Sequence, residues 1–287
     1  MSKVKNRQFW ESATLNNATF MQYYRRLVEI GISNIEWVNI PSTVDTRYLE
    51  LALFSEGKAV FFEDEVLGYL CLRCVVNGNF TVYRIPKLRV AISENGYKKS
   101  LNNENSVIIY NNLLHTNSML EVEMYAKRLY NIDRAIDVNV NAQKTPILIQ
   151  CDEDQRLTMK NAYMKYEGNE PVIFGDKNIS PNAVKVMSTG APYVAGNLYD
   201  LRCKIWNEAL TVMGVHNVSD EKKERMIEKE VMAGLGAVQA YRNGKLEARK
   251  MACKQINEMF GLNIDVRFRD DIGNIADKLR DEVIVNE

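Results

Sequence analysis

Apolar positions in the first thirty residues follow the spacing of one helix face. They recur every three or four residues, and Gly31 stands where a helix C-cap would lie. This spacing predicts a helix, then an extended link over residues 35–41 that carries Trp37, and a second, short helix over residues 46–54. The apolar positions of the first helix are Phe20, Tyr23, Tyr24, Leu27 and Ile30.

Residues 58–112 change to the alternating pattern of β-strands. Two Asn-Gly pairs, Asn77-Gly78 and Asn95-Gly96, interrupt this pattern, and such pairs favour tight hairpin turns because both residues accept a positive φ. An antiparallel, β-rich block is therefore predicted. Its strands are Val66–Val76, Phe80–Ile85, Leu88–Ile92 and Val107–Tyr110, after an extended start at Ala59 to Phe62.

The helical period returns in two long segments, residues 118–140 and residues 195–215. The second carries an apolar stripe that includes Leu198, Leu201, Ile205 and Trp206. A short α/β segment separates the two helices, with turns rich in Asn, Gly and Pro. Its predicted strands are Thr145–Gln150, Pro171–Phe174 and Ala183–Met187, and its predicted helix is Glu153–Tyr166.

The C-terminal part alternates helices with a loop. A helix is predicted from Ser219 or Asp220 to Gly234, where an aperiodic stretch rich in Gly and Ala predicts a loop up to Gly244. The remaining predicted elements are a helix at residues 246–260 that closes at Gly261, a strand at residues 264–269 with Ile264, Val266 and Phe268 on one face, and a helix at residues 272–283.

Composition narrows the classes of protein. Apolar residues make up 46% and charged residues 26%, which excludes wholesale disorder, and the net charge of zero argues against tight, sequence-independent DNA binding. No run of apolar residues is long enough to cross a membrane, and no apolar core follows the first ten residues as in a signal peptide. Five cysteines, an odd number, indicate reduced thiols in a cytosolic protein.

Sequence motifs for enzyme chemistry are weak. Cys71 and Cys74 match C-x-x-C, but an offset of three in a strand puts the two sulfurs on opposite faces. The glycines before Lys245 lack P-loop spacing, and the only two histidines, His115 and His216, have no nucleophile signature beside them. No cofactor or metal is therefore expected.

Two charge patterns leave alternatives open. The runs of carboxylates, for example Glu63–Glu65 and Asp152–Asp154, suit solvated turns and helix starts, although a metal-dependent nuclease built on them is the rival hypothesis. Arg267 and Arg269, with the cations of residues 245–250, form either a basic face for nucleic acid or a solvated face. Alone, these patterns predict an α+β protein that is not an enzyme and whose long helices need partners.

Eight ordered segments between about residues 30 and 275 carry a family resemblance. They are Glu36–Pro41, Val107–Asn112, Val138–Ile149, Tyr166–Phe174, Ala191–Val194, Trp206–Glu208, Lys222–Met226 and Ile256–Asn263. In order and spacing they resemble the portal protein, also called upper collar or head–tail connector, of small protein-primed podoviruses that infect Gram-positive bacteria.

The resemblance implies a portal fold assembled as a dodecameric ring around a channel for double-stranded DNA. Long stem helices, an α/β clip and a mixed α/β wing are expected, and zero net charge suits a conduit that must not hold the DNA it passes. The implied divisions are an N-terminal wing at 1–117, stem helices at 118–140 and 193–215, a clip at 141–192, and a C-terminal wing at 216–287 with a channel loop at 231–245.

The resemblance also implies site residues and partners. Channel candidates are Gly234, Gly236, Arg242, Lys245, Arg202 and Lys204, and subunit-interface candidates are Leu198, Leu201, Ile205 and Trp206. The basic arm that binds a packaging RNA in this family is reduced here to Lys3, Lys5 and Arg7, interspersed with other residues. Expected partners are further copies of the chain, the major capsid and scaffold proteins, the packaging ATPase, and the lower collar or tail. The chain would be made in the host cytoplasm and reside at the portal vertex of the virion.

Overall fold

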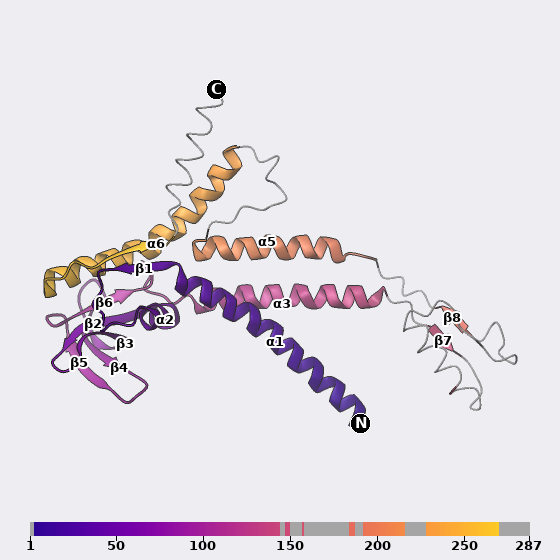
Figure 1. Ribbon diagram of the computed structural model, residues 1–287, viewed down its shortest axis with the longest axis horizontal. Helices are drawn as coiled ribbons and strands as arrows, with labels where there is room; N and C mark the ends of the chain where they lie inside the picture. The colour runs from indigo at the N-terminus through magenta and orange to yellow at the C-terminus, as the bar shows by residue number, and fades with distance from the viewer. Residues whose placement is uncertain are drawn as a thin grey trace. The chain divides into compact units, whose positions relative to one another are not determined.

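The computed structural model describes residues 3–143, 147–149, 157, 184–186, 192–215 and 228–269. The chain divides into two units, one formed by Met1–Asn131 with Arg202–Glu287 and the other by Ile132–Leu201. Helices and an antiparallel sheet both contribute, which confirms the mixed α+β class (Figure 1). No helix among the described residues is long and apolar enough to span a membrane.

The N-terminal helix α1 covers Lys3–Ser33, and the strand β1, Ile35–Val38, follows it at once. The helix prediction is confirmed, but Gly31 is not the C-cap, because the helix continues past it. A Cβ at Gly31 would lie only 2.3 Å from the Phe54 ring, so glycine here permits close packing of α1 on α2, Thr46–Glu56.

An antiparallel five-stranded sheet has the order β5-β4-β3-β2-β6. Both of its faces are buried: Phe61 and Cys71 belong to one apolar cluster, whereas Phe62 and Cys74 belong to another. The prediction that the two sulfurs lie on opposite faces is therefore confirmed. The strands are β2 Lys58–Asp64, β3 Gly68–Phe80, β4 Pro86–Ile92, β5 Lys98–Asn102 and β6 Ser106–Tyr110.

The two Asn-Gly pairs behave differently. Asn95-Gly96 forms the predicted turn between β4 and β5, and Gly96 has φ +88°. Asn77-Gly78 is not a turn, because β3 continues through it with a shift in register. The turn lies at Thr81–Ile85 instead, where the Thr81 amide donates to the Ile85 carbonyl at 2.8 Å. The predicted separation into strands Val66–Val76 and Phe80–Ile85 is therefore wrong.

Strand β9, Asp265–Phe268, pairs antiparallel with β1, and Trp37 lies opposite Val266. Ile264 and Val266 are buried and Phe268 is half-buried, which confirms the predicted apolar face of this strand. The pairing joins segments that are far apart in the sequence. Residues 35–38 are therefore a paired strand rather than the start of an unpaired link.

The two long helices are α3, Met119–Ala142, and α5, Ala195–Met213, close to the predicted bounds. Between them, β7 (Ile147–Ile149) and β8 (Val184–Val186) pair antiparallel within two of the predicted strands. The other predicted elements of this segment, Glu153–Tyr166 and Pro171–Phe174, lie outside the described residues apart from Leu157, as does the helix predicted at 272–283.

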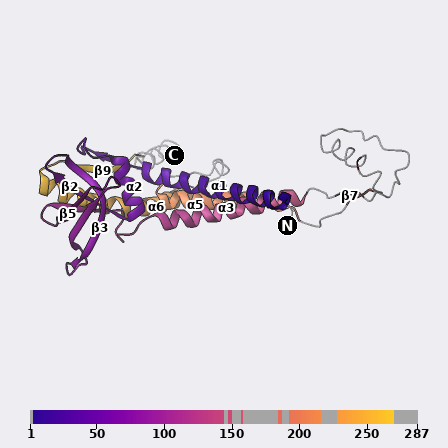
Figure 2. The same ribbon diagram turned by 90° about the horizontal axis from the view of Figure 1, so that it is seen from below.

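Helix α6 runs without a break over Glu228–Phe260 and packs against β6 and β9 (Figures 1 and 2). The loop predicted at residues 231–245 is therefore wrong. The buried positions of this part of α6 keep a helical spacing, with Val238, Arg242 and Arg249 buried and Lys245 half-buried. Because three of these four are cations, a search for apolar periodicity cannot detect the stripe.

Candidate functional site

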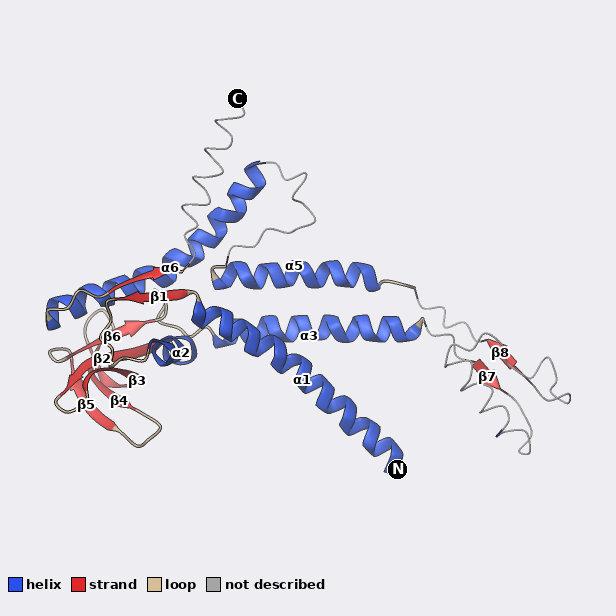
Figure 3. Ribbon diagram, in the orientation of Figure 1, coloured by secondary structure: helices blue, strands red, loops and turns tan. Residues whose placement is uncertain are grey.

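Helices α3 and α5 run antiparallel side by side (Figure 3). In one unit, the Tyr125 hydroxyl on α3 donates to Glu208 Oε1 on α5 at 3.0 Å, and Arg128 lies 3.8 Å from the same carboxylate. Burial and this hydrogen bond raise the pKa of Tyr125 to about 12, so the phenol keeps its proton and continues to donate at neutral pH. In the other unit, Asn139 contacts the residues just before α5.

The four α5 side chains predicted to form subunit contacts differ in their burial. Ile205 is buried within the chain, and Trp206 packs against α1, with its ring centroid 6.2 Å from that of Tyr23. Leu198 is half-buried and Leu201 is 44% exposed. Ile205 and Trp206 thus have partners within the chain, whereas Leu201 keeps an exposed apolar surface.

The cations predicted for the channel do not share one face. Arg202 and Lys204 are two residues apart on α5, so the helix turns them about 200° from each other. Lys204 is exposed, whereas Arg202 is half-buried and has interactions within the chain. In a ring lined by α5, only one of these two side chains could therefore point toward the channel.

Arg242 and Lys245 do not lie on a flexible loop but on α6, and both reach the C-terminal end of α5. Arg242 Nε donates to the Gly214 carbonyl at 2.6 Å, and its guanidinium lies 4.5 Å from the centre of the Phe268 ring. Lys245 Nζ donates to the Val212 carbonyl at 3.2 Å. These hydrogen bonds direct both cations into the subunit.

Lys245 has an unusual environment for a lysine. Part of its side chain is exposed, but its amino group lies among protein atoms. This burial lowers the pKa of Lys245 to about 8, and the nearby charge of Arg249 adds to the effect, while Glu121 and Glu50 act in the opposite sense. A lysine held this way cannot serve as a freely hydrated contact for phosphate groups.

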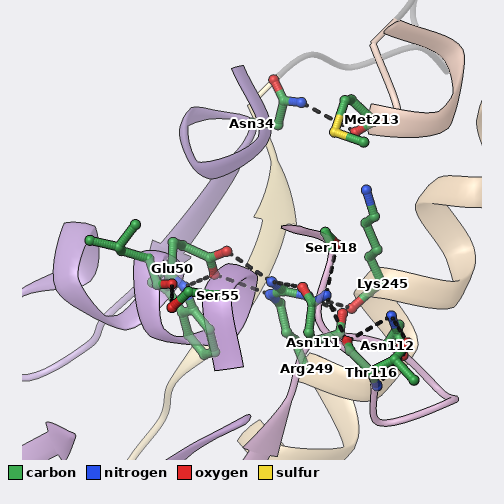
Figure 4. Close-up of polar contacts among 12 residues, drawn as sticks. Asn34, Glu50, Ser55, Asn111, Asn112, Thr116, Ser118, Met213, Lys245 and Arg249 are labelled. Carbon is green, nitrogen blue, oxygen red and sulfur yellow. Dashed lines mark hydrogen bonds and ion pairs between the residues drawn. The ribbon is translucent and has the colours of Figure 1, made fainter. Parts of the chain in front are cut away.

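Beside Lys245, a buried polar network holds α6 to the sheet unit, that is, the five-stranded sheet with α2 packed on it (Figure 4). Arg249 is 2% exposed, and its Nε and Nη2 donate to the two oxygens of Glu50 at 3.1 and 2.8 Å. The remaining hydrogens of Nη1 and Nη2 meet Asn111 and the Lys245 carbonyl. All five guanidinium donors are thus satisfied, and Glu50 also accepts from Trp37 Nε1 at 2.8 Å.

Residues 50, 111 and 249 were not predicted as a group from the sequence. Arg249 was considered for a basic surface, but its burial against Glu50 excludes that role. The available signal was the spacing 242, 245, 249 on one helix face, which indicates a buried stripe only if cations are allowed at core positions. Such positions are rare, because a buried charge requires a partner.

The other sequence candidates are scattered. Gly236 is exposed on α6, and Gly234 lies on the same helix. Lys3, Lys5 and Arg7 lie on α1. The ring of His115 stacks on Tyr110 with centroids 3.5 Å apart, and His216 lies outside the described residues.

Comparison with known proteins gives the family. The "Phage Connector (GP10)" family model matches residues 2–273. A chain in the structure of the portal and tail of native bacteriophage P68 has a TM-score of 0.54 and 14% identity, covering 100% of this chain and 99% of that chain, which shows a shared fold. An HK97-family phage portal protein from Corynebacterium diphtheriae is less similar, with a TM-score of 0.42 and 13% identity over 90% of this chain and 94% of that one. Because the family match spans almost the whole sequence, the chain belongs to the phage connector (GP10) family.

Proposed function

We propose that this connector assembles as a dodecameric ring that forms the channel for double-stranded DNA at the portal vertex of a podovirus infecting Gram-positive bacteria. The observation that carries the proposal is the connector family match over residues 2–273. The shared fold with a chain of the P68 portal and tail supports it. Such a ring surrounds DNA during packaging and ejection and has a structural role rather than a catalytic one.

The regions of the chain suit the parts of a portal. The sheet unit with α1, α2 and the C-terminal part of α6 would form the wing, α3 and α5 the stem, and residues 141–192 the clip. In support, the antiparallel pair α3 and α5 brackets the predicted clip, and residues 132–201 cluster as a unit of their own. The wing would contact capsid and scaffold proteins, and the clip the packaging ATPase and then the lower collar or tail.

We expect fewer residues to contact nucleic acid than the sequence predicted. Since Arg242 and Lys245 hydrogen-bond inside the subunit, Lys204 on α5 is the better channel candidate, and Gly234 and Gly236 would meet DNA only through the α6 surface. Lys3, Lys5 and Arg7 on α1 would be the contact for a packaging RNA where the particle uses one. Zero net charge favours a loose channel through which DNA moves freely.

Imaging and mass measurement test the proposal. Purified protein should give rings with a central hole in negative stain, and native mass spectrometry should give twelve times the 33.0 kDa chain. A monomer with metal-dependent nuclease activity would instead favour the rival hypothesis. That hypothesis has no structural support, because no cluster of three or more His, Cys, Asp or Glu side chains within the described part of the chain could hold a metal ion.

A further inference from the structure

We infer that Asn34, Arg242 and Lys245 are positioning residues that hold the C-terminal end of α5 at a fixed direction relative to the sheet unit. The inference rests on the proposed function, in which α5 is a stem helix and the sheet unit is the wing. It assigns the two buried cations a mechanical task within the subunit.

The last carbonyl groups of α5 find their hydrogen-bond partners in two ways. A helix leaves its final carbonyls without intrahelical partners. Here Gly214, with φ +85°, ends the helix: its amide donates to the Thr211 carbonyl, and the Val215 amide donates to the Leu210 carbonyl, both at 2.9 Å. This is the hydrogen-bond pattern of a Schellman motif, and it gives backbone partners to two of the last carbonyls of the helix.

The next three carbonyls are bound by side chains instead. Lys245 Nζ binds the carbonyl of Val212, Asn34 Nδ2 binds that of Met213 at 3.3 Å, and Arg242 Nε binds that of Gly214 (Figure 4 shows the Asn34 contact). Asn34 comes from the connection between α1 and β1, whereas the two cations come from α6. The end of α5 is thus held from two separate elements.

Three donors from two elements do more than cap a helix. A cap needs to satisfy orphan carbonyls, which water or one side chain can do. Successive residues of a helix are placed about 100° apart around its axis, so donors on the carbonyls of Val212 and Met213, with a third on Gly214 just beyond the helix, hold its end at separate points and oppose both rotation and tilt. The positioning role follows from this arrangement, in addition to any contribution to stability.

The donors are themselves held firmly. Arg242 is 4% exposed, packs on the Phe268 ring, and passes so near Gly214 that a Cβ there would lie 3.1 Å from Arg242 Cγ. The backbone of Lys245 is tied to the core, because its carbonyl accepts from Arg249 Nη1 at 3.1 Å. Through Arg249, the connection continues to Glu50 on α2. A rigid path therefore runs from the sheet unit to the end of α5.

Amide hydrogen exchange on the full-length protein tests the role. Lys245→Met keeps the length of the side chain, removes the donor, and relieves a buried charge, so folding should not suffer. Asn34→Ala removes the donor from the other element. In both variants, we expect the amides of residues 209–215 to exchange about tenfold faster, while the amides of β2 and β6 keep their rates. The matched control is Lys250→Met, an exposed lysine on the same helix, which should change neither.

The outcomes separate positioning from general stability. Unchanged exchange at residues 209–215 in both variants would overturn the inference, and so would an equal increase across β2 and β6. Negative-stain images of the same samples keep the proposed function distinct. If the wild-type chain forms no rings, the proposed function fails, while exchange still decides the role of the three side chains. If rings form and exchange does not respond, only the inference fails.

Discussion

The two ends of α5 are held in opposite ways. At the C-terminal end, Val212 and Met213 are buried, and three side chains from α6 and the α1–β1 connection bind consecutive carbonyls. At the N-terminal end, the preceding residue Val194 has no polar side chain that could cap the helix, and its amide donates to Asn139 Oδ1 at 3.0 Å on an exposed surface. Opening one end therefore breaks a buried network, whereas opening the other exposes little.

This contrast shows that one helix can have very different local stability along its length. Local opening free energies depend on buried contacts and protected hydrogen bonds rather than on helix propensity alone. In a connector, the end of α5 nearest the sheet unit would stay fixed, and adjustment would occur toward residues 192–201. The predictions below test the contrast from the largest expected effect to the smallest.

Removing Arg249 should have the largest effect, because it leaves Glu50 buried without its ion-pair partner. We expect Arg249→Met to lower the free energy of unfolding by about 3–5 kcal/mol, measured by chemical denaturation. Arg267→Met is the matched control, since the Arg267–Glu36 pair has a similar distance of 2.9 Å but an Arg267 side chain that is 65% exposed. The control should lose far less stability, because water screens an exposed ion pair. Equal losses would show that burial does not distinguish the two pairs.

The pH dependence of stability should report the buried amino group of Lys245. Its pKa falls from 10.5 to about 8 on folding, so between these values the unfolded chain binds the proton and the folded chain does not. Stability should therefore rise with pH across this window, by up to about 1.4 kcal/mol per pH unit relative to Lys245→Met. The measurement is the wild-type minus variant difference in unfolding free energy at pH 7.5 and 9.5. A flat difference would mean that the amino group is not desolvated.

Glycine-to-alanine substitutions should act with opposite sign at the two ends of α5. Gly214→Ala forces a side chain into the left-handed region and toward Arg242, and should cost about 1–2 kcal/mol. Gly196→Ala, with no neighbouring atom within 4 Å of the new Cβ, should be neutral or stabilise by up to about 1 kcal/mol. Thermal denaturation of both variants measures the contrast, which a loss at Gly196 would contradict.

Asn139→Ala should have the smallest global effect. Its amide donates to the Pro192 carbonyl and its oxygen accepts from Val194, but both contacts are exposed. We expect the free energy of unfolding to fall by about 0.5–1 kcal/mol. Faster amide exchange should be confined to residues 194–198. Asn141→Ala, an exposed position on the same helix, serves as the control. A large drop in melting temperature would show that this end of α5 is not weakly held.

Sequence periodicity located α3 and α5 well, because their inward positions are apolar and repeat over many turns. It failed for residues 231–245, where buried cations replace the apolar signal and glycines mimic a loop. The turn at Asn95-Gly96 was predictable because the strands on both sides end there, whereas at Asn77-Gly78 longer strands extend past the local signal. Partners distant in sequence, such as Glu50 for Arg249, leave no local pattern at all.

The burial of three cysteines in the apolar cores has a chemical consequence for experiments on α5. Burial raises the pKa of Cys74 to about 11, and that of Cys253 to about 12, so these thiols are almost never thiolates at neutral pH. Cys71 is buried as well, which leaves half-buried Cys203, on α5, as the most reactive of the four cysteines that the structure describes. Among these four, alkylating probes should therefore label Cys203 first, and its rate of labelling can report local opening of α5 in native, unmutated protein.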